Sequence, residues 1–293
     1  MEEQLLAFLK YLEQEHHYSE NTIAAYRNDL GQFLGFVEDS QGRKISSWEE
    51  VNSDYIQAYL DFMKNKPKPY ASSTIARKVA AIKSFFNYLT GEHIISENPA
   101  LDIDSPKVKK RLPQTLTLEE VDKLLAAPAT GNTPKNLRDQ ALLSVLYSTG
   151  MRVSEVVSLK LDDVDFKNKV LHPPGKTDDL REIPLEKETA ELLEKYLAEG
   201  RPQLVKNDQE QSLFLNHRGE KLTRQGLWLI IKGYAKQVDL ESEVTPHTLR
   251  HSFAAHRLSK GSDLEEIQRL LGHANISTTQ IYTQLESAEE TTT

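Results

Sequence analysis

Arginine and histidine side chains around position 250 have the spacing needed to bind a phosphodiester. His247, Arg250 and His251 are three and four residues apart, which places them on one face of a helix. Thr245 suits the N-cap of that helix and Pro246 suits its first position. An arginine can clamp a phosphate with two hydrogen bonds, and a histidine can donate or accept a proton. The segment therefore predicts a phosphate-binding site at a helix start.

The two histidines could instead hold a zinc ion, since they are one helical turn apart. The metalloprotease pattern requires a glutamate directly after the first histidine, and Thr248 stands at that position. The chain also has no cysteine, which excludes thiolate metal sites and disulfides. We expect no metal here.

Arg152, His273 and Tyr282 lie where helices are predicted to begin or end. Arg152 follows Gly150, which can end one helix, and the next helix begins at once, so the helix dipole favours an anion there. His273 follows Gly272, which ends the preceding helix, and Tyr282 lies in the first two turns of a new one. Each residue alone fits an ordinary structural role. Together they indicate chemistry on a phosphate.

The elements that must position these residues are mostly helical. Apolar residues at helical spacing, with capping residues before them, predict helices over residues 5–12, 21–37, 53–63 and 74–89 in the first hundred positions, the third capped by Ser53. Further on, the same signals predict helices over 117–125, 137–147, 187–198, 223–237, 246–259 and 263–271, the last capped by Ser262, and short strands over 164–166, 170–171 and 182–185. The expected fold is mostly α with a small inset antiparallel β-sheet.

The chain is expected to contain two domains. Its 293 residues exceed an ordinary single domain, and the segment from Pro106 to Pro113 holds four cations with almost no apolar periodicity. We predict a helical domain over 1–104, a basic linker over 105–114 and a second domain over 115–293.

The net charge of −8 conceals an uneven distribution. Residues 64–111 hold 10 Lys and Arg against 4 Asp and Glu, whereas residues 1–63 hold 4 against 12. The basic segment could follow a phosphate backbone, and the alternative is a solvated charged face. No apolar run is long enough to span a membrane and the N-terminus has no signal-peptide pattern, so a cytoplasmic protein is expected.

Taken in order, these residues resemble the signature of the tyrosine recombinase (phage integrase) family. Arg152, a lysine in a strand turn, His247-x-x-Arg250, Leu-Gly-His273 and Tyr282 follow one another as in that family. The flanking residues resemble its Xer-type branch, as do Tyr18-Ser-x-x-Thr and Tyr-x-x-Asp-Leu-x-x-Phe in the first domain. The resemblance covers nearly the whole chain.

The resemblance implies a mechanism for each residue. Arg152 and Arg250 would neutralise the scissile phosphate, and His273 would donate a hydrogen bond to it. His247 would assist deprotonation of Tyr282, which would attack to form a 3′-phosphotyrosyl bond. Lys176 would protonate the leaving 5′-oxygen, although Asp178 and Asp179 stand in a hairpin tip that is usually more basic in the family. No ATP, metal or other cofactor would be required.

The resemblance also implies partners. A helical core-binding domain and a catalytic domain would close on double-stranded DNA as a C-shaped clamp, with contacts from Arg77, Lys78, Lys83, Arg224 and Gln225. Four protomers, of one kind or mixed with a related recombinase, would exchange strands through a Holliday junction.

The Xer-type resemblance favours resolution of chromosome dimers at a dif-like site, with an FtsK-type translocase as a possible activator. The alternatives are a mobile-element integrase with the same chemistry, a type IB topoisomerase-like enzyme, and a DNA-binding protein without catalysis.

Overall fold

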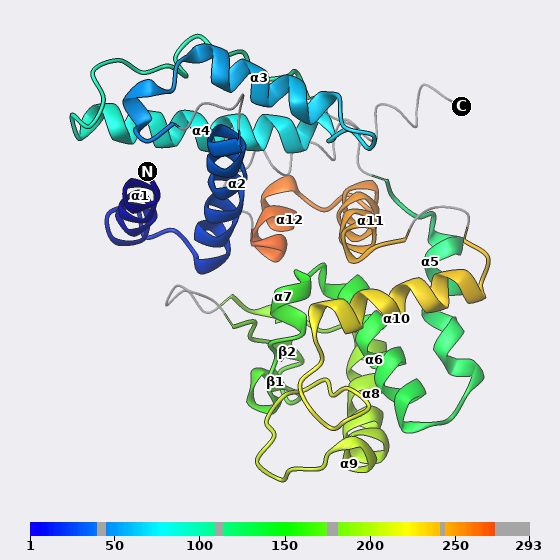
Figure 1. Cartoon of the computed structure of the whole chain (residues 1–293). Coiled ribbons are helices and arrows are strands. Elements are labelled where there is room, and N and C mark those ends of the chain that lie inside the picture. The colour runs from blue at the N-terminus through cyan, green and yellow to red at the C-terminus, as the bar shows by residue number, and fades with distance from the viewer. Residues whose placement is uncertain (40–44, 109–113, 175–180, 241–243, 273–293) are drawn as a thin grey trace, which may run out of the picture. The chain divides into compact units, whose positions relative to one another are not determined.

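The computed structural model of the chain contains two compact units, Met1–Lys110 and Arg111–Thr293. The division falls inside the segment 105–114 that the sequence marks as a linker. Each unit has its own apolar core. The fold class is confirmed: most residues are helical, and the one sheet of the described residues is small and antiparallel (Figure 1). The structure describes residues 1–39, 45–108, 114–174, 181–240 and 244–272.

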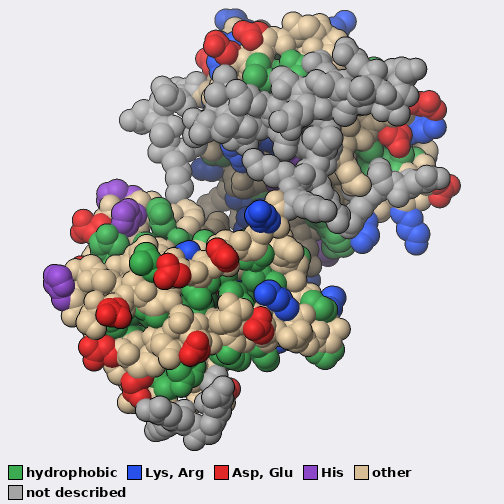
Figure 2. Space-filling view, turned by 90° about the horizontal axis from the view of Figure 1, so that it is seen from above, with side chains coloured by type: hydrophobic (Ala, Val, Ile, Leu, Met, Phe, Trp, Pro, Cys, Tyr) green, Lys and Arg blue, Asp and Glu red, His purple; other side chains and the backbone are tan. Residues whose placement is uncertain are grey.

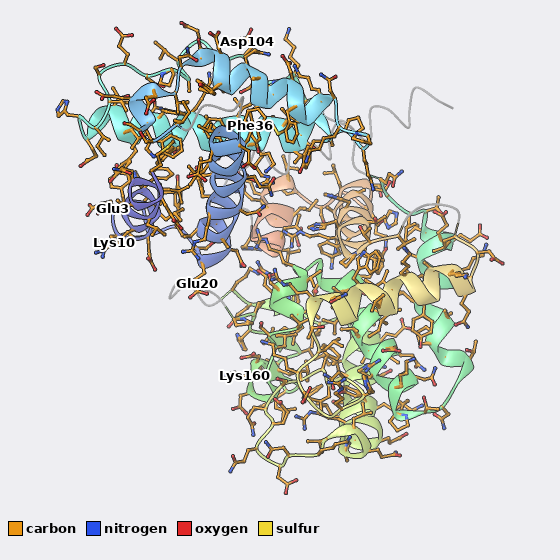
Figure 3. The ribbon with its side chains drawn as sticks, viewed as in Figure 1. Glu3, Lys10, Glu20, Phe36, Asp104 and Lys160 are labelled. Carbon is orange, nitrogen blue, oxygen red and sulfur yellow. The ribbon has the colours of Figure 1, made fainter. Side chains whose placement is uncertain are left out.

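The N-terminal unit folds around an aromatic core. Phe85 packs edge-to-face against Phe8 and Trp48, with ring centroids 5.3 and 4.8 Å apart. Charged side chains such as Glu3 and Lys10 lie on the outer side of the first helix (Figure 3). This amphipathic pattern is the one predicted from the leucine spacing. The elements are α1 (Glu2–Gln14), α2 (Glu20–Asp39), the 3-10 helix η1 (Trp48–Glu50), α3 (Ser53–Lys64) and α4 (Ser72–Gly91).

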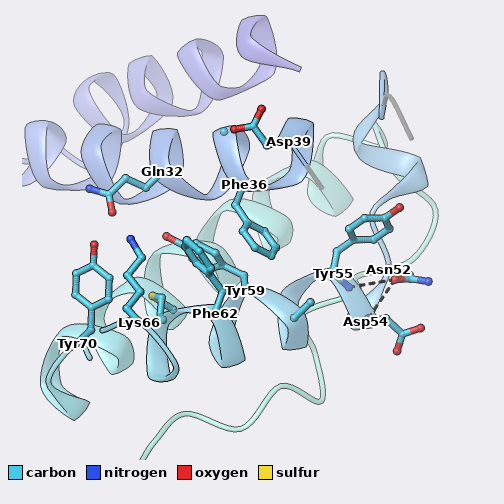
Figure 4. A pocket seen from close by; sticks show the side chains of 13 residues that line it. Gln32, Phe36, Asp39, Asn52, Asp54, Tyr55, Tyr59, Phe62, Lys66 and Tyr70 are labelled. Atoms are coloured by element: carbon cyan, nitrogen blue, oxygen red, sulfur yellow. Dashed lines mark hydrogen bonds between the residues drawn. The ribbon is translucent and has the colours of Figure 1, made fainter. Parts of the chain in front are cut away.

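A pocket of about 870 Å³ opens between α2 and α3 of this unit (Figure 4). Its lining includes an aromatic group of Phe36, Tyr59 and Phe62. The ring centroid of Phe36 lies 5.1 Å from the ring centroids of the other two. The Lys66 ammonium lies over the Phe62 ring at 4.6 Å from its centroid. All of the lining residues lie between Gln32 and Tyr70, so the pocket belongs to the N-terminal unit.

Two helices are capped by the residue adjacent to the predicted one. Asn52, not Ser53, caps α3, and its side chain accepts from the backbone N–H of the second and third helical residues. Asp263, not Ser262, caps the last helix. In each case two good capping residues are adjacent, and the one with an extended backbone directly before the first helical turn caps the helix.

The C-terminal unit is organised around α6 (Pro134–Thr149). This helix is buried on nearly all sides and packs against α8 and α11, which lie far from it in the sequence. It therefore fixes the direction of α11, which carries the predicted site residues His247 and Arg250. The other helices are α5 (Leu118–Ala126), α7 (Val153–Val156), α8 (Lys187–Lys195), α9 (Arg201–Leu204), α10 (Arg224–Gln237), α11 (Pro246–Ser259) and α12 (Leu264–Leu271), with short η2 (Ala127–Thr130), η3 (Leu161–Asp163) and η4 (Tyr196–Gly200).

The sheet has three short antiparallel strands in the order β1 (Val164–Asp165), β2 (Val170–Leu171) and β3 (Ile183–Pro184). Leu171 pairs with Val164 on one side and with Ile183 on the other. The three predicted strands are confirmed, each to within one residue at either end. The connection from β2 to β3 includes residues 175–180, which lie outside the described part of the chain.

The surface carries charges of both signs. Acidic, basic and hydrophobic side chains are interspersed over the described residues on the face that Figure 2 shows. Within the described ranges, no helix has the length and apolar content needed to cross a membrane.

Candidate active site

Arg152 lies at a tight junction between two helices. Gly150 ends α6 with a positive φ of 59°, and a methyl group there would overlap the Phe253 ring. Arg152 then caps α7, and its backbone N–H donates to Glu155 Oε2 at 2.7 Å. The predicted glycine stop and helix start are both confirmed.

Arg250 lies on the first turns of α11, which begins as predicted. The Thr248 backbone N–H donates to Thr245 Oγ1 at 3.1 Å, and Pro246 occupies the first position. The Arg250 side chain is only 6% exposed. It donates from Nη1 to the Gly150 carbonyl at 2.6 Å and from Nη2 to the Leu271 carbonyl at 2.8 Å. This arginine therefore ties the ends of α6 and α12 together.

The two arginines meet at one turn. Arg152 donates from Nη2 to the Gly272 carbonyl at 2.7 Å, one residue beyond the carbonyl that Arg250 holds. Its Nη1 also lies 3.1 Å from Glu155 Oε1, and its side chain remains 43% exposed. Gly272 ends α12 with φ 63°, which confirms the predicted helix end. The packing thus brings together two cationic groups that could hold one anion.

His247 and His251 share the face of α11 that was predicted, with ring centroids 6.5 Å apart. His247 is exposed, whereas His251 is half-buried. Burial, together with the positive charges of His247 and Arg250, lowers the pKa of His251 to about 4. His251 is therefore neutral at pH 7. No cluster of three potential metal ligands occurs among the described residues.

The lowered pKa of His251 predicts a loss of stability in mild acid. In the unfolded chain His251 binds a proton below its ordinary pKa of 6.5, whereas in the folded chain it does so only below about pH 4. Relative to His251→Asn, the wild type should therefore lose on the order of 1 kcal/mol of unfolding free energy between pH 7 and pH 5. Urea unfolding at both pH values measures this difference. His217 is exposed, so His217→Asn serves as the control. If His251→Asn loses as much unfolding free energy between pH 7 and pH 5 as the wild type, the lowered pKa of His251 is contradicted.

Three predicted site residues, Lys176, His273 and Tyr282, lie outside the described residues. The turn that leads into His273 is described as far as Gly272 and carries the two arginine contacts. The sequence pattern indicated no role for Arg181, whose side chain reaches the same turn.

The structure corrects one predicted DNA contact. Lys78 is 2% exposed and its ammonium donates to Asp29 Oδ1 at 2.9 Å and to Gln32 Oε1 at 3.0 Å. A buried, paired ammonium cannot reach a DNA phosphate, so the prediction for Lys78 is wrong. Arg77 also pairs with Asp29, but its side chain is half exposed. Lys83 is partly exposed, and Arg224 and Gln225 are exposed at the start of α10.

Lys78→Ala is expected to weaken folding rather than DNA binding. The change leaves the buried Asp29 carboxylate with one cationic partner instead of two, which should cost about 3 kcal/mol of unfolding free energy. Lys83→Ala, on the same helix, should change stability by less than about 0.5 kcal/mol. Urea denaturation of both variants tests the pair. A stable Lys78→Ala variant with reduced DNA affinity would restore Lys78 as a DNA contact.

The chain matches two family descriptions that together span most of its length. Residues 114–289 match the phage integrase family, and residues 5–93 match the phage integrase N-terminal SAM-like domain. The division between the matched segments agrees with the two compact units.

Known proteins resemble the chain along almost its whole length. A tyrosine recombinase XerC from Herpetosiphon aurantiacus is 52% identical, over 97% of this chain and 90% of the relative. A tyrosine recombinase XerD from Listeria monocytogenes is 44% identical, over 94% of this chain and 92% of the relative. The crystal structure of XerH in a post-cleavage complex with a palindromic difH substrate is 25% identical, with a TM-score of 0.77 over 97% of this chain and 82% of that one. The chain therefore belongs to the phage integrase family of tyrosine recombinases, with the Xer-type enzymes as its relatives.

Proposed function

We propose that this chain cuts and rejoins DNA at a specific site through a covalent bond between Tyr282 and a 3′-phosphate. One observation carries the proposal. Arg152 and Arg250, from helices far apart in the sequence, both hold carbonyls of the Leu271–Gly272 turn. Two guanidinium groups directed at one turn suit a phosphodiester, whose non-bridging oxygens gain charge in the transition state.

The carbonyl contacts of the two arginines have a clear role in this proposal. They hold each guanidinium in place before DNA binds, so that little reorganisation is needed when a phosphate arrives. Arg152 is exposed enough to exchange contacts with a ligand, whereas the buried Arg250 offers a fixed charge. Glu155 orients Arg152 by accepting hydrogen bonds from both its backbone and its side chain.

The remaining roles fall to His247 on α11 and to Tyr282, Lys176 and His273, which lie outside the described part of the chain. The Tyr282 oxygen attacks the scissile phosphorus, its proton leaves with the assistance of His247, and the P–O bond to the 5′-oxygen breaks. Lys176 supplies the proton that the departing 5′-oxygen takes up. His273 donates a hydrogen bond to the phosphate. Because the tyrosyl ester keeps the bond energy, a 5′-hydroxyl of another strand can reverse the attack and rejoin the DNA without ATP or metal.

Site recognition is proposed to use both units, joined by the basic linker over 105–114. Arg77 and Lys83 on α4 offer charges to phosphates, which carry no sequence information. Gln225, exposed beside Arg224 at the start of α10, has the donor and acceptor pair that reads an adenine edge in the major groove. Changing Gln225 should therefore alter site preference more than overall affinity.

The biological reaction is proposed to be resolution of chromosome dimers at a dif-like site. This assignment rests on the names of the relatives and on the difH substrate of the XerH complex. Four protomers, identical or mixed with a related recombinase, would exchange strands through a Holliday junction, with an FtsK-type translocase as a candidate activator. A mobile-element integrase uses the same chemistry and is the alternative.

A suicide substrate tests the proposed reaction. A duplex nicked near the cleavage site loses a short fragment after cleavage, which traps the covalent intermediate. The wild-type chain should form an adduct that resists SDS, in EDTA and without ATP. Sequencing DNA retained by the protein in cells supplies the site and separates a chromosomal target from a mobile element. A strict need for a divalent metal would contradict the mechanism.

A further inference from the structure

Arg181 approaches the same carboxylate as Arg152. It lies two residues before the start of β3, and its side chain is 17% exposed. Its Nη2 donates to Glu155 Oε2 at 3.2 Å and its Nη1 donates to Oε1 at 3.5 Å. Arg152 uses both oxygens of that carboxylate as well. Glu155 is therefore held between two guanidinium groups that come from different elements.

Arg181 also packs on the turn whose carbonyls accept hydrogen bonds from Arg152 and Arg250. A methyl group added at Gly272 would overlap Arg181 Nη1 and would lie 3.4 Å from Arg152 Nη1. The absence of a side chain at Gly272 is what lets Arg181 reach this position. Arg181 thus touches Glu155 and the turn at once, and Arg152 spans the same two groups.

The charges around this turn do not balance among the described residues. Arg152 and Arg181 bring two positive charges to Glu155, which brings one negative charge. The Nε of Arg181 is buried and has no hydrogen-bond partner in the described ranges. The position of Arg181 therefore leaves one of its hydrogen-bond donors unsatisfied. Because Glu155 is shared with Arg181, it orients the Arg152 guanidinium but neutralises less of its charge than it would if it paired with Arg152 alone. Arg152 therefore keeps more positive charge to attract a phosphate.

We propose that Arg181 is a positioning residue of the strand-cleavage reaction, which acts through Glu155 and the Gly272 turn to hold Arg152 toward the scissile phosphate. This inference rests on the proposed function. Arg181 does not touch the reacting atoms. Its loss lets Glu155 turn fully onto Arg152 and lets the turn shift, so that the Arg152 guanidinium is displaced from the phosphate.

The test compares single-turnover cleavage of a nicked duplex by the full-length wild type, Arg181→Ala and a matched control. Arg257→Ala is the control, because Arg257 pairs with Glu186 in the same unit. Arg181→Ala should cleave roughly 10- to 100-fold more slowly at saturating DNA, with DNA affinity changed less than about threefold. Arg257→Ala should cleave at the wild-type rate.

Two further measurements separate positioning from a structural effect. In a Glu155→Ala background, Arg181→Ala should slow cleavage by a smaller factor than in the wild type, since the path through Glu155 is already lost and only the contact with the Gly272 turn remains. A methylphosphonate at the cleavage site has no charge for Arg152 to neutralise, so the ratio of wild-type to Arg181→Ala rates should shrink there. A folding defect would slow both substrates alike.

The outcomes are distinguishable from failure of the proposed function. If the wild type forms no covalent adduct, the function is wrong. If the wild type forms the adduct and Arg181→Ala cleaves equally fast, the inference is overturned. It is also overturned if the rate reductions of Arg181→Ala and Glu155→Ala multiply in the double variant. Should Arg181→Ala not fold, Arg181→Lys keeps the charge but loses the two-pronged contact with Glu155, and it should show a smaller defect of the same kind.

Discussion

Tyr282→Phe is expected to abolish the covalent protein–DNA adduct while leaving DNA binding intact. Phenylalanine keeps the ring but removes the oxygen that attacks the phosphorus, so the covalent bond cannot form at this position. The rate of adduct formation should fall by roughly 10⁴-fold or more, as for other enzymes that lose a nucleophile. Gel electrophoresis in SDS with labelled suicide substrate measures the adduct, and a mobility shift without SDS measures binding.

The control for this variant is a tyrosine elsewhere on the surface. Tyr18 is 41% exposed in the N-terminal unit, and Tyr18→Phe should form the adduct at the wild-type rate. An adduct that persists in Tyr282→Phe would move the nucleophile to another residue. Loss of binding together with the adduct would instead make Tyr282 a structural residue.

The helix ends around the site were predictable because they depend on local chemistry. Gly150 and Gly272 adopt the positive φ that favours glycine, and each stands where the apolar periodicity stops. Thr245 and Pro246 likewise specify the start of α11. The two misplaced caps involve adjacent residues of similar capping strength, so local preference could not choose between them.

The meeting of Arg152 and Arg250 could not be read from the sequence without the family resemblance. It depends on α11 packing against α6, so that Arg250 bonds the carbonyl of Gly150. Apolar spacing shows which face of each helix is buried, but it does not show which helices touch. The contact between Arg181 and Glu155 could not be predicted for the same reason, since the two residues belong to different elements.

The sequence contained a pattern that indicates the buried position of Lys78. Lys78 stands between Ile75 and Ile82 at helical spacing, so it lies on the apolar stripe of α4. Asp29 lies on the buried side of α2 in the same way. Opposite charges on two apolar stripes predict a buried pair, because a lone buried charge is too costly. A basic residue near other basic residues is therefore a weak indication of DNA contact by itself.

Lys176→Ala is expected to lose cleavage of an ordinary phosphodiester and to regain it on a sulfur-substituted one. A 5′-alkoxide is a poor leaving group, and a general acid that protonates it contributes about 10³-fold in rate. When sulfur replaces the bridging 5′-oxygen, the thiolate departs without a proton. Single-turnover cleavage of both substrates should show a loss of about 10³-fold on oxygen and of less than about tenfold on sulfur.

Arg152→Ala is the matched comparison for this experiment, because it tests charge on the phosphate rather than proton delivery. Its defect, roughly 10²-fold for loss of one charge-assisted contact, should be the same on oxygen and on sulfur. If sulfur fails to rescue Lys176→Ala, the proton comes from elsewhere, and His247, exposed on the same face of α11 as Arg250, is the next donor to test. If sulfur rescues both variants equally, bond cleavage to the leaving group is not limited by protonation, and the hairpin lysine is a groove contact.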